Sequence, residues 1–356
     1  MKRKIRLISV LMALLMLAFA LTACSAPASV SSESKPAADV SVSASTANTD
    51  QTGDTGKTQP GEKAIKNYVI GISPLTTQHE YYIVYLEGIK AAAEDRGVTV
   101  VISDPNWDVA TQTSQIEDFV TQKVDAIICS PTNPEGIKPA LVEAEEAGIP
   151  VLVEMTLIEG VYPLIGTDQY AGAFMAGQYA GQWAVDNNGG QGKAALLDYP
   201  YFQNCRDRAK GYQDGLASVA PDVEWVTAID CGATMEGALK TAEDILQATP
   251  DINIMFGING DSAKGAAAAY ESAGADPAKI CVIGFDAGQD EKKNMAEGGY
   301  IKASVAADGM IIGADAIDAA IRKIEGEDLG EWVKCSDDAQ YLVTAENVNQ
   351  YYTPSN

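Results

Sequence analysis

The chain has 356 residues, with 25 Lys and Arg against 49 Asp and Glu, a formal net charge of −24 and a single histidine, His79. This acidic balance argues against binding to DNA or RNA, whose phosphates are bound by clustered Lys and Arg. One histidine excludes most zinc sites and leaves a Ser-His-Asp triad only one possible base. The length favours two domains, because single hydrophobic cores stop growing before this size.

The N-terminal residues predict export. Four basic side chains lie within the first six residues, and an apolar run follows from Leu7 to Ala20. This pattern is typical of a secretory signal, and the run is too short for a comfortable membrane span. The next residues, Leu21-Thr22-Ala23-Cys24, resemble the bacterial lipobox, in which the cysteine is lipid-modified and becomes the new N-terminus. We therefore predict a signal peptide over 1–23, lipidation of Cys24 and a membrane anchor on the extracytoplasmic face.

Residues 24–66 predict a disordered tether. The segment after Cys24 is rich in Ser, Thr, Ala, Gly, Pro, Gln and Asp and holds no aromatic residue and no Leu. Such a segment cannot bury enough apolar area to offset the entropy lost on ordering. Cleavage of the signal would remove the four basic residues and change the formal net charge from −24 to −28.

From Asn67 onward, short apolar runs alternate with helical patterns, which indicates βαβ units and parallel sheets. The first series of predicted strands is Tyr68–Ser73, Val98–Ser103, Ala126–Cys129, Ile149–Val153 and Tyr162–Gly166. A helix is predicted over 81–96, and a longer one over 170–186 leads to the second series. That series is Lys193–Asp198, Glu224–Asp230, Ile254–Gly257, Ile280–Gly284 and Ala303–Ala306. A helix over 310–324 follows, and two α/β lobes are expected.

Ligands of open parallel sheets bind beyond the carboxyl ends of the strands, so the residues there form the candidate site. They are Gln78, His79, Glu80, Tyr81, Tyr82, Asp104, Asn106, Trp107, Glu154 and Thr156 in the first lobe, and Tyr199, Asn204, Arg206, Asp230, Asn259, Asp261, Asp286 and Gln289 in the second. Planar polar groups and aromatic rings dominate this set, and Lys is absent from it. Such groups match the hydroxyls and the C–H faces of an uncharged polyhydroxylated ligand.

Six short segments, taken together and in order, resemble type I periplasmic sugar-binding proteins of the ribose- and galactose-binding kind. The segments are Gln78–Tyr82, Gly148–Val151, Thr167–Gly172, Arg206–Tyr212, Asn259–Ala266 and Val282–Asp286. The resemblance extends from Asn67 to about Val343. It implies an α/β fold of that type, with two Rossmann-like lobes joined by a three-crossover hinge. Its implied lobe boundaries are 67–168 with 308–336, and 169–307 with 337–356.

The resemblance also implies a function and a set of binding residues. A lipid-anchored, extracellular monomer would capture a monosaccharide or polyol and deliver it to an ABC transporter permease. It would use no cofactor, no metal and no catalytic residue. Tyr81 and Tyr82 would stack on the sugar ring, and Arg206, Asn259 and Asp286 would bind its hydroxyls. His79 stands where the family usually has Asn.

The chain departs from the family pattern at several of these positions. After the fourth strand the family commonly has Asp-Arg, whereas this chain has Glu154, Met155 and Thr156. Near the last crossover the polar family residue falls on Ala307, with Asp308 beside it. We expect Glu154, Thr156 and Asp308 to act as substitutes. Trp107 is expected near the cleft on its strand-end position alone.

Structural roles compete with these assignments. Arg206 can pair with Asp207 or Asp230, Tyr82 lies on the apolar stripe of its helix, and Asn259 is also a good turn residue. Asp286 can be a solvated loop carboxylate, and His79 a surface residue at a helix start.

Three further questions concern cysteines and function. Cys129 and Cys281 fall in buried strand runs, and no spacing pairs Cys205 with Cys231, although an exported context permits a disulfide.

A sensor lipoprotein of the same fold would share every binding residue. An enzyme acting on glycosides is the remote alternative, because two carboxylates such as Glu154 and Asp286 can support that chemistry. No phosphate-binding glycine loop is present.

Overall fold

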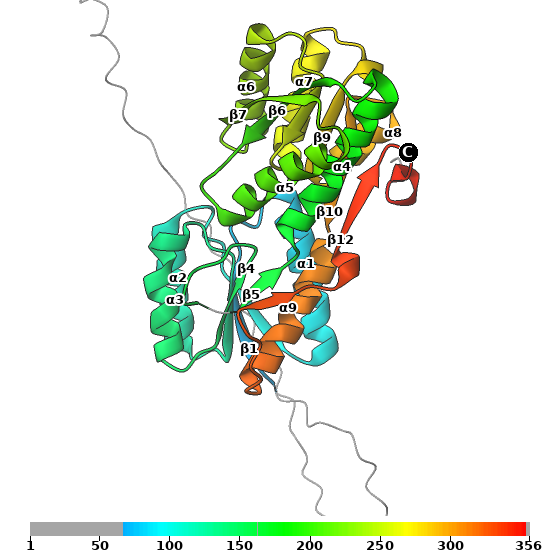
Figure 1. Cartoon of the computed structure of the whole chain (residues 1–356). Helices are drawn as coiled ribbons and strands as arrows, with labels where there is room; N and C mark the ends of the chain where they lie inside the picture. The colour runs from blue at the N-terminus through cyan, green and yellow to red at the C-terminus, as the bar shows by residue number, and fades with distance from the viewer. Residues whose placement is uncertain (1–66, 162, 354–356) are drawn as a thin grey trace, which may run out of the picture. The chain divides into compact units, whose positions relative to one another are not determined.

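A computed structural model describes residues 67–161 and 163–353. The predicted signal peptide, the lipidation of Cys24 and the predicted tether lie outside these residues. Within the described residues the chain forms two six-stranded sheets, each flanked by helices, and we call each sheet with its helices a lobe (Figure 1).

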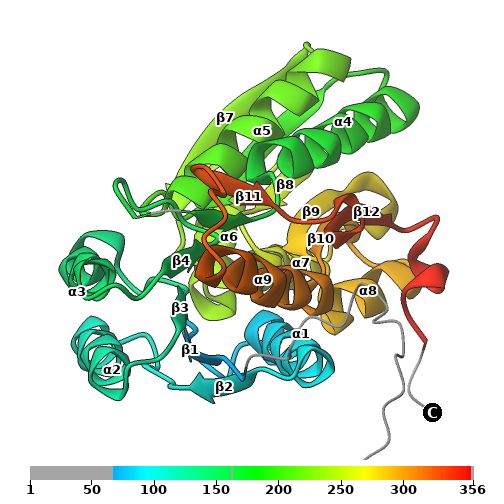
Figure 2. The same ribbon diagram turned by 90° about the horizontal axis from the view of Figure 1, so that it is seen from below.

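The N-terminal lobe is built on an all-parallel sheet of strand order β11-β5-β4-β3-β1-β2. Its strands are β1 (Val69–Ser73), β2 (Thr99–Ile102), β3 (Ala126–Cys129), β4 (Val151–Glu154), β5 (Leu164–Gly166) and β11 (Trp332–Lys334). Its helices are α1 (Glu80–Arg96), α2 (Val109–Gln122), α3 (Pro134–Glu146) and α9 (Gly309–Ile324). Helices α2 and α3 cover one face of the sheet, and α1 and α9 pack together on the other (Figure 2).

The C-terminal lobe has the strand order β12-β10-β9-β8-β6-β7, in which β12 alone is antiparallel to its neighbour. Its strands are β6 (Gly192–Asp198), β7 (Val223–Asp230), β8 (Ile254–Gly257), β9 (Cys281–Asp286), β10 (Ile301–Ala307) and β12 (Gln340–Thr344). Its helices are α4 (Gln169–Asn188), α5 (Gln203–Val219), α6 (Met235–Ala248), α7 (Gly260–Ser272) and α8 (Gln289–Ala296).

The chain passes between the two lobes three times. It crosses from β5 into α4, from β10 into α9 and from β11 towards β12. The predicted fold class, two mostly parallel lobes with a three-crossover hinge, is confirmed. The central strands β3, β4 and β8 are buried throughout and are continuous apolar runs. Such runs are a local signal, and the ten predicted strands agree with the structure to within a few residues.

Two strands, β11 and β12, were not predicted. Each is an edge strand, and β11 has only three residues, with two of them exposed. A short, half-exposed edge strand carries no continuous apolar run, so its pairing partner decides its structure.

Helices α4 and α5 approach each other closely because glycines line their interface. A Cβ on Gly215 would lie 2.2 Å from the carbonyl oxygen of Phe174, and one on Gly211 would lie 2.5 Å from that of Tyr170. This contact fixes the position of α5, which begins at the edge of the sheet where ligands are expected.

Two further features of the described residues bear on the sequence predictions. Among them, no helix combines the length and apolar character needed to cross a membrane. Cys129, Cys205, Cys231, Cys281 and Cys335 are all buried free thiols. Cys205 and Cys231 therefore form no disulfide here, and Cys129 and Cys281 are core residues with 0% exposure.

Candidate functional site

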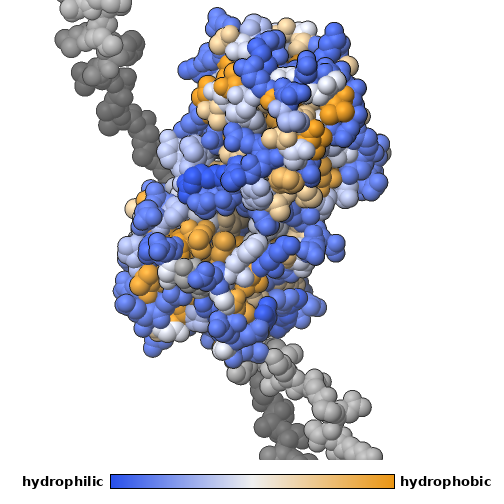
Figure 3. Space-filling view, viewed as in Figure 1, coloured by the Kyte–Doolittle hydropathy of each residue, from blue (hydrophilic) through white to orange (hydrophobic). Residues whose placement is uncertain are grey.

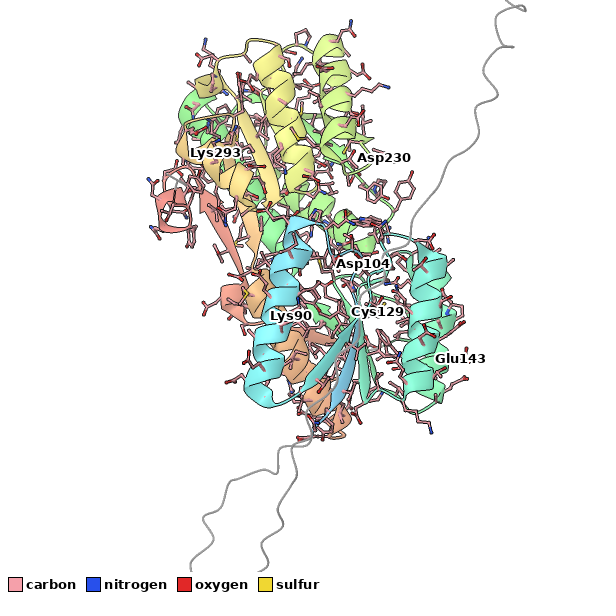
Figure 4. The ribbon with its side chains drawn as sticks, turned by 180° about the vertical axis from the view of Figure 1, so that it is seen from behind. Lys90, Asp104, Cys129, Glu143, Asp230 and Lys293 are labelled. Carbon is pink, nitrogen blue, oxygen red and sulfur yellow. The ribbon has the colours of Figure 1, made fainter. Side chains whose placement is uncertain are left out.

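A cavity of about 480 Å³ lies between the lobes, at the carboxyl ends of the parallel strands. Asp104, after β2, and Asp230, at the end of β7, lie at the facing ends of the two lobes (Figure 4). The N-terminal lobe contributes Leu75, His79, Tyr81, Tyr82, Trp107, Ser130, Pro131, Glu154, Met155 and Thr156 to the lining. The C-terminal lobe contributes Tyr199, Phe202, Asn204, Cys205, Arg208, Gly232, Ala233, Thr234, Ile258, Asn259, Asp261 and Asp286.

Glu154 is a buried carboxylate at the end of β4, with 0% exposure. Tyr81 Oη donates to its Oε1 over 2.8 Å, and Ser130 Oγ donates to its Oε2 over 2.6 Å. Burial raises the pKa of Glu154 to about 7, although these two hydroxyl donors act to lower it. Glu154 is therefore a polar group that accepts hydrogen bonds in the N-terminal lobe, and its charge changes near neutral pH.

Arg208 supplies the guanidinium of the cavity from the first turns of α5. Its Nε donates to Gln169 Oε1 over 2.8 Å, and its Nη1 donates to the carbonyl oxygen of Ile258 over 3.0 Å. The Nη1 atom also lies 3.9 Å from Asp286 Oδ1, and the guanidinium lies 3.7 Å above the Phe285 ring. Nη2 is buried and has no hydrogen-bond partner within the described chain. A rigid donor therefore remains available to a ligand oxygen.

Asp286 ends β9 and accepts a hydrogen bond from the backbone N–H of Gly260 over 3.2 Å. Burial raises the pKa of Asp286, and the positive charge of Arg208 opposes that rise. Its side chain is 18% exposed, so one edge of the carboxylate stays open to the cavity.

Two cavity residues also cap helices. His79 is the N-cap of α1, where its Nδ1 accepts from Tyr81 N over 3.3 Å. Asn259 is the N-cap of α7: its Oδ1 accepts from Ser262 N and Oγ, and its Nδ2 donates to the carbonyl oxygen of Ala233. Capping therefore orients both side chains. Each keeps one N–H donor for another partner, on Nε2 of His79 and on Nδ2 of Asn259.

Backbone strain is concentrated around the cavity. Among the lining residues, Trp107, Met155, Ala233 and Asp286 have φ values of 66°, 60°, 52° and 96°. Non-glycine residues adopt this region at a cost, and such residues cluster at binding and catalytic sites. Each of the four follows or ends a strand of its sheet, so the strain lies in the loops that shape the cavity.

Two side-chain hydrogen bonds connect the lobes near this cavity. Thr156 Oγ1 lies 3.5 Å from Asn204 Oδ1, and the backbone N–H of Gln289 donates to Glu80 Oε1 over 2.8 Å. On the face shown in Figure 3, apolar side chains also gather on the N-terminal lobe beside the boundary between the lobes.

Eight of the ten predicted binding residues line the cavity: His79, Tyr81, Tyr82, Trp107, Glu154, Thr156, Asn259 and Asp286. Tyr81 does not present an open ring face, because it stacks on Tyr85 at 6.0 Å and is only 8% exposed. Its hydroxyl instead orients Glu154. Trp107 is 53% exposed and lies at the mouth.

The prediction for Arg206 is wrong in placement. The side chain is exposed and donates to Gln203 Oε1 and to the carbonyl oxygen of Pro200, outside the cavity lining. The predicted alternatives, ion pairs with Asp207 or Asp230, do not form either. Arg208, and not Arg206, lines the cavity. Helix periodicity could have identified it, because Cys205, Arg208 and Tyr212 fall on one buried stripe of α5 and Arg206 lies on another face.

Asp308 also lies outside this cavity. It is the N-cap of α9, where its Oδ1 accepts from Met310 N and Ile311 N. It borders a second cavity of about 390 Å³ together with Glu80 and Glu291. The capping role explains an Asp at this position without a ligand. Sequence reasoning also missed Ser130 and Phe202 as lining residues.

Comparison with known proteins identifies the family. The sequence profile of the periplasmic binding protein domain matches residues 70–328. The chain belongs to this family. The ribose import binding protein of Bacillus subtilis is 31% identical over 265 residues, which cover 74% of this chain and 83% of that protein.

Solved structures of family members share the fold described here. A solute-binding protein of an ABC transporter from Mycobacterium smegmatis, solved with bound glycerol, is 26% identical, with a TM-score of 0.73. The match covers 82% of this chain and 98% of that one. A solute-binding protein from Burkholderia graminis, solved with D-arabinose, is also 26% identical, with a TM-score of 0.71 and coverage of 82% and 100%.

Proposed function

We propose that this protein is a lipid-anchored, extracytoplasmic solute-binding protein that captures a monosaccharide or polyol between its lobes and delivers it to an ABC transporter permease. The observation that carries the proposal is the base of the cavity. There Arg208 Nη2 has no partner within the described chain, and Asp286 stands beside the same guanidinium with one edge open. A donor and an acceptor so close together suit adjacent sugar hydroxyls.

Lining residues of both lobes contact the ligand in this proposal. Arg208 and Asp286 bind hydroxyls from the C-terminal lobe, and Asn259 adds the second N–H of its side-chain amide. From the N-terminal lobe, Glu154 accepts a hydroxyl hydrogen, and His79 donates from Nε2, because its Nδ1 already accepts from Tyr81 N. Tyr82 also lines the cavity, where an edge of its ring can contact a C–H group of the ligand.

Closure of the lobes then signals that the site is loaded. A ligand that touches both lobes binds the closed form more tightly, so it shifts the population towards that form. A permease that recognises the closed form would accept only the loaded protein. The three connections between the lobes are the segments that can bend.

A thermal-shift screen of the purified protein against pentoses, hexoses, deoxy sugars and polyols tests the binding step. A sugar present at a hundred times its dissociation constant adds about 2.7 kcal/mol to the unfolding free energy, which raises the melting temperature measurably. The Asp286→Asn variant serves as the matched control, and its shift should be much smaller. If no sugar, polyol or glycoside raises the melting temperature, the proposed function is wrong.

Anchoring through Cys24 has its own test. Cells that express the chain are fed a labelled fatty acid, and the wild-type protein is compared with a Cys24→Ser variant. We expect label and membrane association in the wild type and loss of both in the variant. Unlabelled wild-type protein in the culture medium would contradict the anchor and leave the binding proposal intact.

A further inference from the structure

We infer that the ligand of the cavity is a glycoside, a sugar whose anomeric oxygen carries a flat apolar group, and not a free monosaccharide. The inference rests on the proposed function and names the class of ligand for the same cavity. It comes from the difference between the base of the cavity and its mouth.

The base is polar and deeply buried. Glu154 is 0% exposed and Arg208 is 3% exposed, and Asp286 lies beside Arg208. The mouth is apolar and open, since Trp107 is 53% exposed and the partly buried Tyr199 and Phe202 line the opposite side. A ligand that satisfies both regions has a hydroxylated end and an apolar end.

The aromatic residues of the mouth come from both lobes. Trp107 belongs to the loop after β2, which Asp104 holds by accepting from the backbone N–H groups of Thr77 and Asn106 (Figure 4). Across the mouth, the Tyr199 ring lies 5.8 Å from Phe202 and 5.0 Å from Tyr201, in the loop between β6 and α5. A flat group at the mouth can contact aromatic rings of both lobes.

Two of these aromatic residues occupy positions where stability alone favours another residue. Trp107 has a φ of 66°, a backbone region that bulky side chains rarely adopt. Phe202 is the N-cap of α5 and makes no side-chain cap, where Ser, Thr, Asp or Asn would satisfy a backbone N–H. Residues that break local rules in this way tend to mark functional positions.

The size of the cavity points to the same ligand class. The volume is about 480 Å³ although the lobes already touch through Thr156 with Asn204 and Glu80 with Gln289. Six CHOH units of roughly one water volume each, about 30 Å³, give a hexose about 180 Å³. More than half of the cavity is left for a further group, and the part beyond the polar base is the aromatic mouth.

Calorimetric titration of matched ligands tests the inference. For each common hexose and pentose, the free sugar, the methyl glycoside and the phenyl glycoside of both anomers are titrated into the full chain. We expect one phenyl glycoside to bind about tenfold tighter than its methyl glycoside, because its ring stacks on the mouth. Trp107→Ala should weaken binding of the phenyl glycoside about tenfold more than binding of the methyl glycoside, which abolishes the advantage. Trp332→Ala, another exposed tryptophan that does not line the cavity, should change neither value.

The outcomes separate the inference from the proposed function. If free sugars bind and their phenyl glycosides bind equally or more weakly, the ligand is a free sugar and the inference is wrong, while the proposed function stands. Equal weakening of methyl and phenyl glycosides by Trp107→Ala also overturns it. If no sugar and no glycoside binds, the inference and the proposed function fail together.

Discussion

The guanidinium of Arg208 and the carboxylate of Asp286 lie 3.9 Å apart on two different elements of one lobe, and both line the cavity. Arg208 is fixed by Gln169 and by the backbone of Ile258, so its position does not depend on Asp286 alone. This arrangement leaves a partly open carboxylate and an unpartnered Nη2 side by side. In the proposed function, this acceptor and this donor bind the ligand.

Two arginines on the same helix provide a matched comparison. Arg208→Lys keeps the charge but cannot make the bonds to Gln169 and Ile258, so we expect at least tenfold weaker sugar binding and about 2 kcal/mol lower stability. Arg206→Lys should change stability by no more than about 0.5 kcal/mol and leave binding unchanged, because its side chain is exposed. Calorimetry and urea unfolding measure both. Similar losses in the two variants would contradict the assignment of Arg208.

Glu291 should make the folded protein less stable as the pH rises. Burial raises its pKa to about 8, and the negative charge of Asp286 adds to the rise. The folded state therefore binds a proton that the unfolded chain releases near its ordinary pKa, and the stability conferred by that proton is lost between about pH 4.5 and pH 8. Melting temperatures should fall over this range in wild type and fall less in Glu291→Gln. The exposed Glu297→Gln should behave like wild type; a flat wild-type profile would contradict the prediction.

Tyr81→Phe tests the hydrogen bond that orients Glu154. The variant removes the donor to Oε1, so ionised Glu154 loses a partner and its pKa should rise further above 7. We expect a loss of about 1–2 kcal/mol at pH 8.5, where the wild-type carboxylate is ionised, and a smaller loss at pH 6. Denaturant unfolding at the two pH values measures it. In the double variant Tyr81→Phe with Glu154→Gln this pH dependence should disappear. An equal loss of stability at both pH values in the single variant would contradict the role of Tyr81 as a donor to Glu154.

The contact between α4 and α5 should tolerate no side chain at Gly215. A Cβ there would lie 2.2 Å from the carbonyl oxygen of Phe174, so Gly215→Ala forces the helices apart at about 1–3 kcal/mol. Because α5 carries Arg208, sugar affinity should fall too. Gln213→Ala places alanine at an exposed position of α5 and should change the stability very little. Unchanged melting temperature in Gly215→Ala would show that the interface relaxes.

Sequence alone located most of the fold because its signals are local. The central strands are continuous apolar runs, and the strand ends carry the polar residues that the parallel-sheet rule places together. The edge strands β11 and β12 were missed because their pairing partners, not their composition, define them.

The candidate site was predicted less completely, for physical reasons that particular residues show. Arg206 and Arg208 lie on the same helix and differ in their angular position around its axis. Arg208 shares the buried face of Cys205 and Tyr212, and only the spacing to these two residues shows this. Asp308 is of a residue type that often binds ligands, but its hydrogen bonds are those of a helix N-cap. The partner of Tyr81, Glu154, is 73 residues away along the chain, so only the folded structure could reveal their bond.

The most direct test of the central claim is a crystal structure of the protein with the first sugar or glycoside that raises its melting temperature. We expect one ligand between the lobes, with a ligand oxygen about 3 Å from Arg208 Nη2 and another hydrogen-bonded to Asp286. A ligand bound in the second cavity beside Asp308, or on the outer surface of either lobe, would contradict it.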